Sequence, residues 1–217
     1  MVQLPTSPLV EVDPAFEKIA VDVAAFTFGL AGTSVREKLL QNLTQDICRS
    51  QLGLAFRMHV TAAKMHGLSY AELLAAIRFI ASYSGYPAAA DALGRLKQLA
   101  SEIGMDTTGL EGPVAPAADC PESFDIEDDW ATEFLNWQVS RAWSEKALSR
   151  RERAIMAITS DVSQQALDDS LRLHVKLAFD AGLSRDDVRN VVRFCAEHGR
   201  TRAVAALRQL DNVLATD

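Results

Sequence analysis

The sequence predicts an all-α protein made of two tandem copies of one helical unit, related by a pseudo-twofold axis. The first observation is an internal repeat in which His174 follows His59 by 115 positions. The second is a series of helix-capping patterns that recur in the same register in both copies. The third is that no segment shows the sustained alternation of apolar and polar residues that is typical of strands.

The repeat is clearest where two segments carry the same residues in register. Residues 57–69, Arg-Met-His-Val-Thr-Ala-Ala-Lys-Met-His-Gly-Leu-Ser, align with residues 172–184, Arg-Leu-His-Val-Lys-Leu-Ala-Phe-Asp-Ala-Gly-Leu-Ser. At the same offset, Arg36-Glu37 and Asp46 align with Arg151-Glu152 and Asp161. We therefore expect one repeat at 13–103, called copy one, and another at 129–215, called copy two.

Each expected helix of copy one has a start or stop signal. Asp13 followed by Pro14 is typical of a helix start. Ser34 with Glu37 and Ser69 with Glu72 have the spacing of capping boxes, and Gly67 is a C-terminal glycine. The expected helices cover residues 13–30, a stretch from 34, then 50–66, 69–84 and 87–102.

Copy two repeats this plan after a different kind of segment. Residues 104–128 are rich in glycine and proline and end in an acidic run, which predicts a surface linker. Residues 1–12 carry Pro5 and Pro8 and predict an extended arm. The expected helices of copy two cover residues 129–145, 149–161, 163–181, 184–197 and 200–214.

The composition of the chain limits the classes of function that are expected. The 217 residues are 48% apolar with a net charge of −7, which is typical of a globular protein and disfavours nucleic acid and anionic membrane surfaces as partners. The weakly polar stretch 19–35 contains Asp22 and is too short to span a bilayer, and we see no signal peptide. Three distant cysteines, Cys48, Cys120 and Cys195, predict free thiols in a reducing cytoplasm.

The repeated histidines are the first candidate site residues. His59 lies along the apolar stripe of Phe56, Val60 and Ala63, and His174 takes the same place in copy two. Partial burial favours a neutral ring that exchanges a proton near neutral pH, as general acid–base catalysis requires. The alternative is a core histidine bonded to a backbone carbonyl. Its retention in both copies gives the catalytic interpretation equal weight.

Arg57 and Arg172 are candidates for binding a substrate carboxylate. Each lies about 200° around its helix from the histidine two positions on, so the two side chains point apart. An arginine reaches a histidine site only if it approaches the histidine of the other copy. The alternative is that each arginine pairs with an acid such as Asp46 or Asp161.

The copies differ at the end of their fourth helix. Copy one has Tyr83 and Tyr86, whose phenols are candidate donors to a developing enolate oxygen, whereas copy two has Glu197 and His198, a candidate acid–base pair. For His198 we favour the interpretation that it is a solvated residue that caps the end of the helix. The aromatic stripe of the helix from Asp129 predicts core or subunit interface; it comprises Trp130, Phe134, Trp137 and Trp143.

Taken together, these motifs resemble the carboxymuconolactone decarboxylase family. The resemblance rests on Arg-x-His-Val…Ala…Gly-Leu-Ser in both copies, on Arg36-Glu37 and Arg151-Glu152, and on the Tyr-Ser-Gly-Tyr-Pro-Ala-Ala stretch at 83–89, which copy two lacks. It implies the all-helical fold shared with alkylhydroperoxidase D-like proteins. It also implies a homo-oligomer, a dimer or trimer of this tandem chain.

The resemblance further implies a class of activity. Redox members carry Cys-x-x-Cys before the histidine, but those positions are Leu52 and Ala55 in copy one and Leu167 and Ser170 in copy two. This favours a decarboxylase, isomerase or cyclase that needs no cofactor or metal. Its substrate would be a small carboxylate-bearing or enolisable lactone or keto compound. The alternatives are a non-catalytic ligand-binding or assembly protein and, last, a thiol peroxidase using Cys48 or Cys195.

Overall fold

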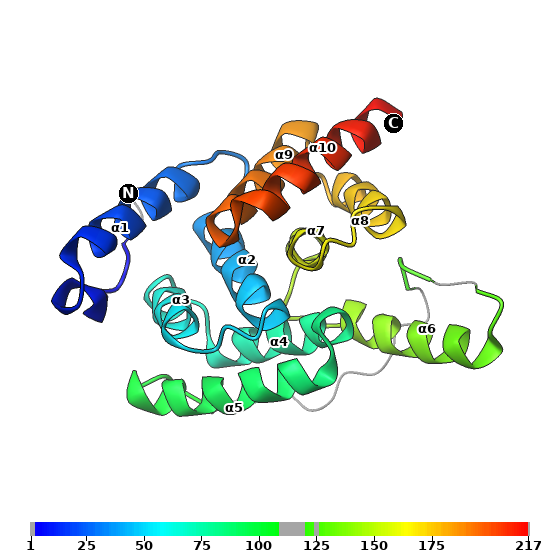
Figure 1. The fold of residues 1–217 in the computed structure, drawn as a ribbon. Coiled ribbons are helices and arrows are strands. Elements are labelled where there is room, and N and C mark those ends of the chain that lie inside the picture. Colours follow the sequence, from blue (N-terminus) through cyan, green and yellow to red (C-terminus); the bar gives the residue numbers. More distant parts are fainter. Residues whose placement is uncertain (1–2, 109–119, 124–125, 217) are drawn as a thin grey trace.

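The computed structural model describes residues 3–108, 120–123 and 126–216, which form ten α-helices and no strand (Figure 1). Most of the predicted linker, at 109–119 and 124–125, lies outside the described residues. The helices are α1 (Pro14–Phe28), α2 (Val35–Cys48), α3 (Leu54–Met65), α4 (Tyr70–Ser84), α5 (Tyr86–Glu102), α6 (Asp129–Trp143), α7 (Arg150–Gln164), α8 (Asp169–Asp180), α9 (Arg185–Phe194) and α10 (Arg200–Thr216).

The predicted caps explain where the helices begin. Asp13 accepts hydrogen bonds from the first turn of α1, and complete capping boxes start α2, α4, α7 and α9. Two local expectations are wrong. The helix expected at 163–181 begins only at Asp169, because α7 continues to Gln164 and ends where Gln165 adopts a left-handed φ of 61°. The arm contains a 3-10 helix, Pro8–Glu11, which the side chain of Ser7 caps.

Helices α2 and α7 pack against each other at the centre and relate the two copies. Arg36 of α2 donates to Glu152 of α7 at 2.5 Å, and Arg151 of α7 donates to Glu37 of α2 at 2.7 Å. Each glutamate also completes the capping box of its own helix. These reciprocal bonds are what a pseudo-twofold axis requires, because one contact made twice joins equivalent residues.

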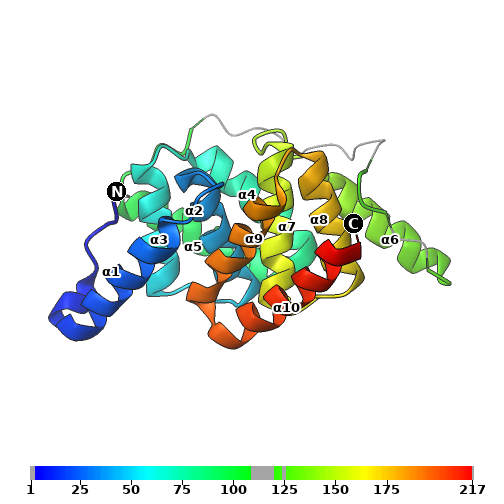
Figure 2. The same ribbon diagram turned by 90° about the horizontal axis from the view of Figure 1, so that it is seen from above.

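The copies exchange their first helices across this axis. Helix α6 of copy two packs on α4 of copy one, and α1 of copy one packs on α9 of copy two. Figure 2 shows α1 at one end of the molecule and α6 at the other. As a result, each copy contributes the end of its fourth helix to the neighbourhood of the other copy's first helix.

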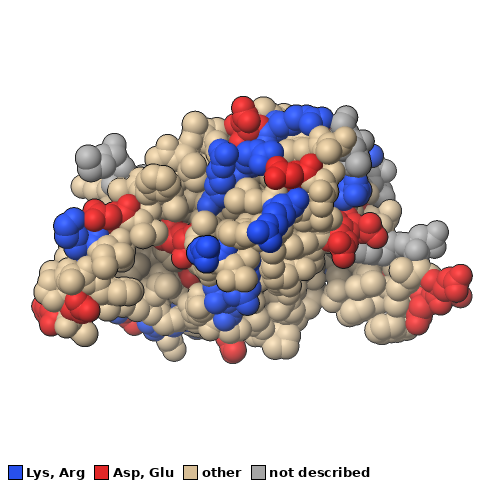
Figure 3. Space-filling model, turned by 45° about the horizontal axis from the view of Figure 1, so that its top comes forward, with Lys and Arg blue, Asp and Glu red and all other residues tan. Residues whose placement is uncertain are grey.

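The surface is uneven in charge and polarity. Figure 3 shows lysine and arginine side chains gathered over α9 and α10, with acidic side chains where α6 begins. Trp143 is buried, whereas Trp130, Phe134 and Trp137 are exposed on α6. No helix in the described part of the chain is long and apolar enough to cross a membrane. The expected homo-oligomer stays a prediction.

The reciprocal ion pairs predict a stability difference. Arg36 bonds to both Glu72 and Glu152, so Arg36→Ala should lower the free energy of unfolding by about 1–3 kcal/mol. The matched control is Arg57→Ala, which breaks an exposed ion pair with Glu102 and should cost less than about 1 kcal/mol. Urea unfolding measures both. Equal losses would contradict a structural role for the cross-copy pair.

Candidate functional site

A buried aspartate holds the repeated histidine in each copy. Asp46 of α2 lies 2.6 Å, through Oδ2, from Nδ1 of His59 on α3, and Asp161 of α7 lies 2.6 Å from Nδ1 of His174 on α8. Both carboxylates are almost fully buried. Such a bond fixes the orientation of the ring and leaves Nε2 as the nitrogen that is free to act.

The aspartates change the protonation of the histidines. Burial alone lowers the pKa of His59, but the hydrogen bond and charge of Asp46, with the charge of Glu197, raise it above its usual value. Burial likewise lowers the pKa of His174, but Asp161 and Glu122 on either side raise it to about 9. The pKa of His174 therefore favours the imidazolium ion at neutral pH, in contrast to the neutral ring expected from burial, and the pKa of His59 is shifted in the same direction.

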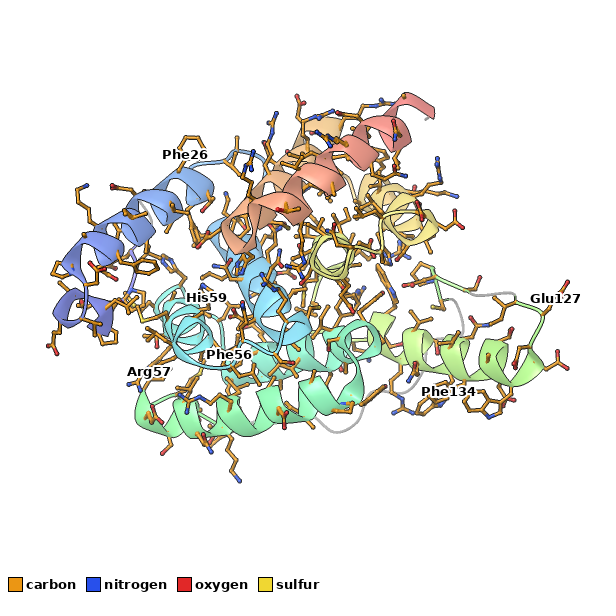
Figure 4. All side chains as sticks on the ribbon, viewed as in Figure 1. Phe26, Phe56, Arg57, His59, Glu127 and Phe134 are labelled. Atoms are coloured by element: carbon orange, nitrogen blue, oxygen red, sulfur yellow. The ribbon has the colours of Figure 1, made fainter. Side chains whose placement is uncertain are left out.

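The first site opens onto a cavity of about 260 Å³ beside His59. Side chains of the N-terminal arm, α1, α2 and α3 line it, and most of them are apolar. In Figure 4, His59 lies between α3, α1 and α2. The polar side chains that line the cavity are Ser7, Glu17, Asn42, His59 and Glu197.

Copy two supplies Glu197 and His198 to this first site. Glu197 accepts a hydrogen bond from Thr27 of α1 at 2.8 Å. His198 lies 3.1 Å, through Nε2, from Oδ1 of Asn42, and its ring centroid is 6.0 Å from that of His59. Burial, then the charges of His59 and Arg49, lower the pKa of His198 to about 3. His198 is thus a partly buried neutral ring and not a solvated cap.

The second site is closed. The side chain of His174 is fully buried, and Nε2 faces Oε2 of Glu122 at 3.4 Å. The same Glu122 oxygen accepts from Tyr83 Oη at 2.6 Å and from Trp143 Nε1 at 2.8 Å. Tyr83 of copy one therefore lies beside His174 of copy two, and the centroids of the two rings are 5.5 Å apart.

The remaining predicted residues lie elsewhere. Arg57 and Arg172 are exposed, and Arg57 donates to Glu102 of its own copy at 2.9 Å. Figure 4 shows Arg57 on the side of α3 that faces the end of α5, away from His59. Arg57 thus pairs with an acid, as in the alternative interpretation, but the acid is Glu102 and not Asp46, which is bonded to His59. Tyr86 is 46% exposed and lines a separate cavity with Arg78 and Glu145.

Several residues that lie beside the two histidines were not identified from the sequence. Asp46 precedes His59 by the same number of residues as Asp161 precedes His174, and this spacing could have predicted the Asp–His pairs. The two aspartates were instead considered as partners of the arginines. Glu122 lies in the connector and has no counterpart in the repeat. Asn42 reaches its site only through tertiary packing, and the aromatic stripe marked Trp143 as core or interface but not as a neighbour of His174.

The cysteines lack the character of redox thiols. Burial is the main cause that raises the pKa of Cys48 to about 11 and of Cys195 to about 12, so neither is a thiolate at neutral pH. All three cysteines are free. Within the described residues, no cluster of three or more His, Cys, Asp or Glu side chains is arranged to hold a metal.

The fold and the paired Asp–His arrangement define an all-helical tandem-repeat protein with one site type built twice. The Carboxymuconolactone decarboxylase family matches residues 14–98 and 130–212, and the chain belongs to that family. Comparison with curated proteins gives no match.

A solved structure from Burkholderia xenovorans LB400 is similar in fold. That protein is proposed to be a gamma-carboxymuconolactone decarboxylase subunit. It is 18% identical, with a TM-score of 0.59, and the match covers 97% of this chain and 92% of that one. At this identity the likeness establishes the fold alone.

The raised pKa of His174 predicts how stability depends on pH. A histidine whose pKa rises from 6.5 in the unfolded chain to about 9 in the folded protein stabilises the fold fully below pH 6.5. This stabilisation is lost as pH rises through about 9. Urea unfolding between pH 6 and 10 should show the decline, and NMR should place the ring titration near 9. The decline should be smaller in His174→Gln; an unchanged slope in that variant would refute the assignment.

Proposed function

We propose that this chain is a cofactor-free acid–base enzyme of the isomerase, cyclase or decarboxylase type, acting at the first site. The substrate would be a small enolisable lactone or keto compound, and His59 would transfer the proton. The observation that carries this proposal is the apolar cavity beside an Asp46-bound histidine. At the second Asp–His pair, by contrast, the carboxylate of Glu122 occupies the Nε2 side of the ring among the described residues.

The lining of the cavity favours a neutral substrate over a carboxylate. Glu17 and Glu197 both line it, and none of the described lining residues is Lys or Arg. A substrate carboxylate would meet two acidic side chains in a space of low polarity, where like charges repel strongly. This supports the enolisable class and makes isomerisation or cyclisation better suited to the site than loss of CO2.

His59 and Glu197 have the complementary properties that enolisation needs. An imidazolium at His59 donates a hydrogen bond to the substrate carbonyl oxygen and then transfers its proton to it. Glu197 takes the proton from the adjacent carbon, and the electrons of that C–H bond move into the new C=C bond of the enol. Transfer of the proton from Glu197 to another carbon, with return of the enol O–H proton to His59, completes an isomerisation; transfer back to the original carbon gives exchange with solvent. His198, neutral and bonded to Asn42, helps to position the pair without itself changing charge.

Hydrogen–deuterium exchange tests this proposal without knowledge of the natural substrate. The protein in D2O is mixed with small γ-lactones and cyclic ketones, and proton NMR follows exchange at the carbon next to the carbonyl. His59→Gln should slow the protein-catalysed exchange by about 10²–10⁴-fold, because general acid catalysis contributes that much. The helical circular dichroism should be unchanged.

His174→Gln is the matched control, because it alters the same position of the repeat at the closed site. Exchange should persist in that variant. Equal loss in both variants, or undiminished exchange in His59→Gln, would contradict the assignment to the first site. Binding of a neutral compound at this cavity with no exchange would favour the alternative of a non-catalytic ligand-binding protein.

Glu197→Gln provides an independent prediction. Exchange should fall by at least about tenfold if Glu197 is the base. The pKa of His59 should also fall, because the charge of Glu197 raises it. NMR titration of His59 measures the second effect, and a lowered pKa with unchanged exchange would remove Glu197 from the mechanism.

A further inference from the structure

Glu122 is the residue that closes the second site. Its side chain is 3% exposed, although it comes from the connector between α5 and α6. Its Oε2 accepts from Tyr83 Oη at 2.6 Å and Trp143 Nε1 at 2.8 Å, and it lies 3.4 Å from His174 Nε2. One carboxylate oxygen is thus surrounded by three polar groups that carry hydrogen.

These three groups belong to the folded copies and not to the connector. Tyr83 is on α4, Trp143 on α6 and His174 on α8. Phe79 contacts both aromatic rings, with centroid distances of 5.4 Å to Tyr83 and 5.5 Å to Trp143. Packing among helices therefore holds the donors in place, whatever carboxylate lies between them.

The charges around His174 also favour an anion. The ring lies between Asp161 at Nδ1 and Glu122 at Nε2. Burial alone raises the pKa of Glu122, but the hydrogen bond and charge of His174, with the hydrogen bonds of Tyr83 and Trp143, bring it below its usual value. A neutral group in the same place would accept the hydrogen bonds but would lack the ion pair with the Nε2 side of the His174 ring.

We propose that the second histidine site is a binding site for a small monocarboxylate, and that Glu122 is its internal occupant. An external carboxylate of the same size replaces the Glu122 side chain between Tyr83, Trp143 and His174. This inference does not rest on the proposed function, because its test measures binding at His174 and not turnover at His59. It also separates the two sites by ligand class: a neutral carbonyl compound at the first and a carboxylate at the second.

Truncation of Glu122 should expose the site. A tethered carboxylate competes with an effective concentration of the order of millimolar, so the unmodified protein should bind external carboxylates weakly. Glu122→Ala keeps the β-carbon and removes one methylene and the carboxylate, which together have the size of acetate. Acetate is therefore the probe, and acetamide is its neutral analogue of similar shape.

The experiment measures binding of acetate and of acetamide to Glu122→Ala by calorimetry and by NMR of carbon-13-labelled acetate. Acetate should bind saturably, at least about tenfold more tightly than acetamide, and should shift the ring signals of His174. Glu122→Gln is the matched control, because it fills the same volume without charge, and it should not bind acetate. Adding Tyr83→Phe to Glu122→Ala should weaken acetate binding by about tenfold.

Absence of acetate binding in Glu122→Ala overturns the proposal, as does equal binding of acetamide or undiminished binding in Glu122→Gln. If Glu122→Ala is unfolded in chloride buffer, refolding is tested in acetate, acetamide and chloride. Folding in acetate alone supports the proposal. Failure to fold in all three, or equal recovery in acetamide, overturns it.

Discussion

The bond between a central aspartate and the histidine of the next helix is the interaction on which both sites depend. Helices α2 and α7 are buried on nearly all sides, so Asp46 and Asp161 lose almost all contact with water. A carboxylate in such a place is stable only when it is paired. The imidazole supplies the pairing, and the aspartate in turn keeps a proton on a ring that burial alone would deprotonate.

The Asp–His pair occurs at both sites, but its surroundings differ between them. At the first site, Nε2 of His59 is left beside an apolar cavity that carries acidic side chains. At the second, Nε2 of His174 meets the carboxylate of Glu122, and hydrogen-bond donors complete the enclosure. The Asp–His pair is therefore the same in both copies, while the residues around it differ in how far they enclose the ring. Ser170 illustrates this: it donates to Asp161, whereas Ala55 at the equivalent position leaves Oδ1 of Asp46 without that hydrogen bond.

Exchange of elements between the copies explains why the sites diverged. Glu197 and His198 of copy two face His59, and Tyr83 of copy one faces His174. The fourth-helix ends differ between the copies, so each difference acts on the other copy's histidine. The candidate residues Tyr83, Glu197 and His198 were identified from the sequence, but their distribution between the sites was not. Helical spacing correctly placed Arg57 on the side of α3 away from His59. Its partner Glu102 was not foreseen, because spacing gives an angle on one helix and says nothing about which element covers each side.

The sequence alone determined the helical class, the duplication, most helix starts and the two histidines. These features are local or repeated, since caps act within one turn and apolar stripes follow the helical period. Only the tertiary structure decided that the aspartates pair with histidines, that α1 and α6 cross to the other copy, and that Glu122 fills one site while the other keeps a cavity. The physical reason is that those contacts join residues far apart in the chain, whose meeting depends on how whole helices pack and not on any spacing along the sequence.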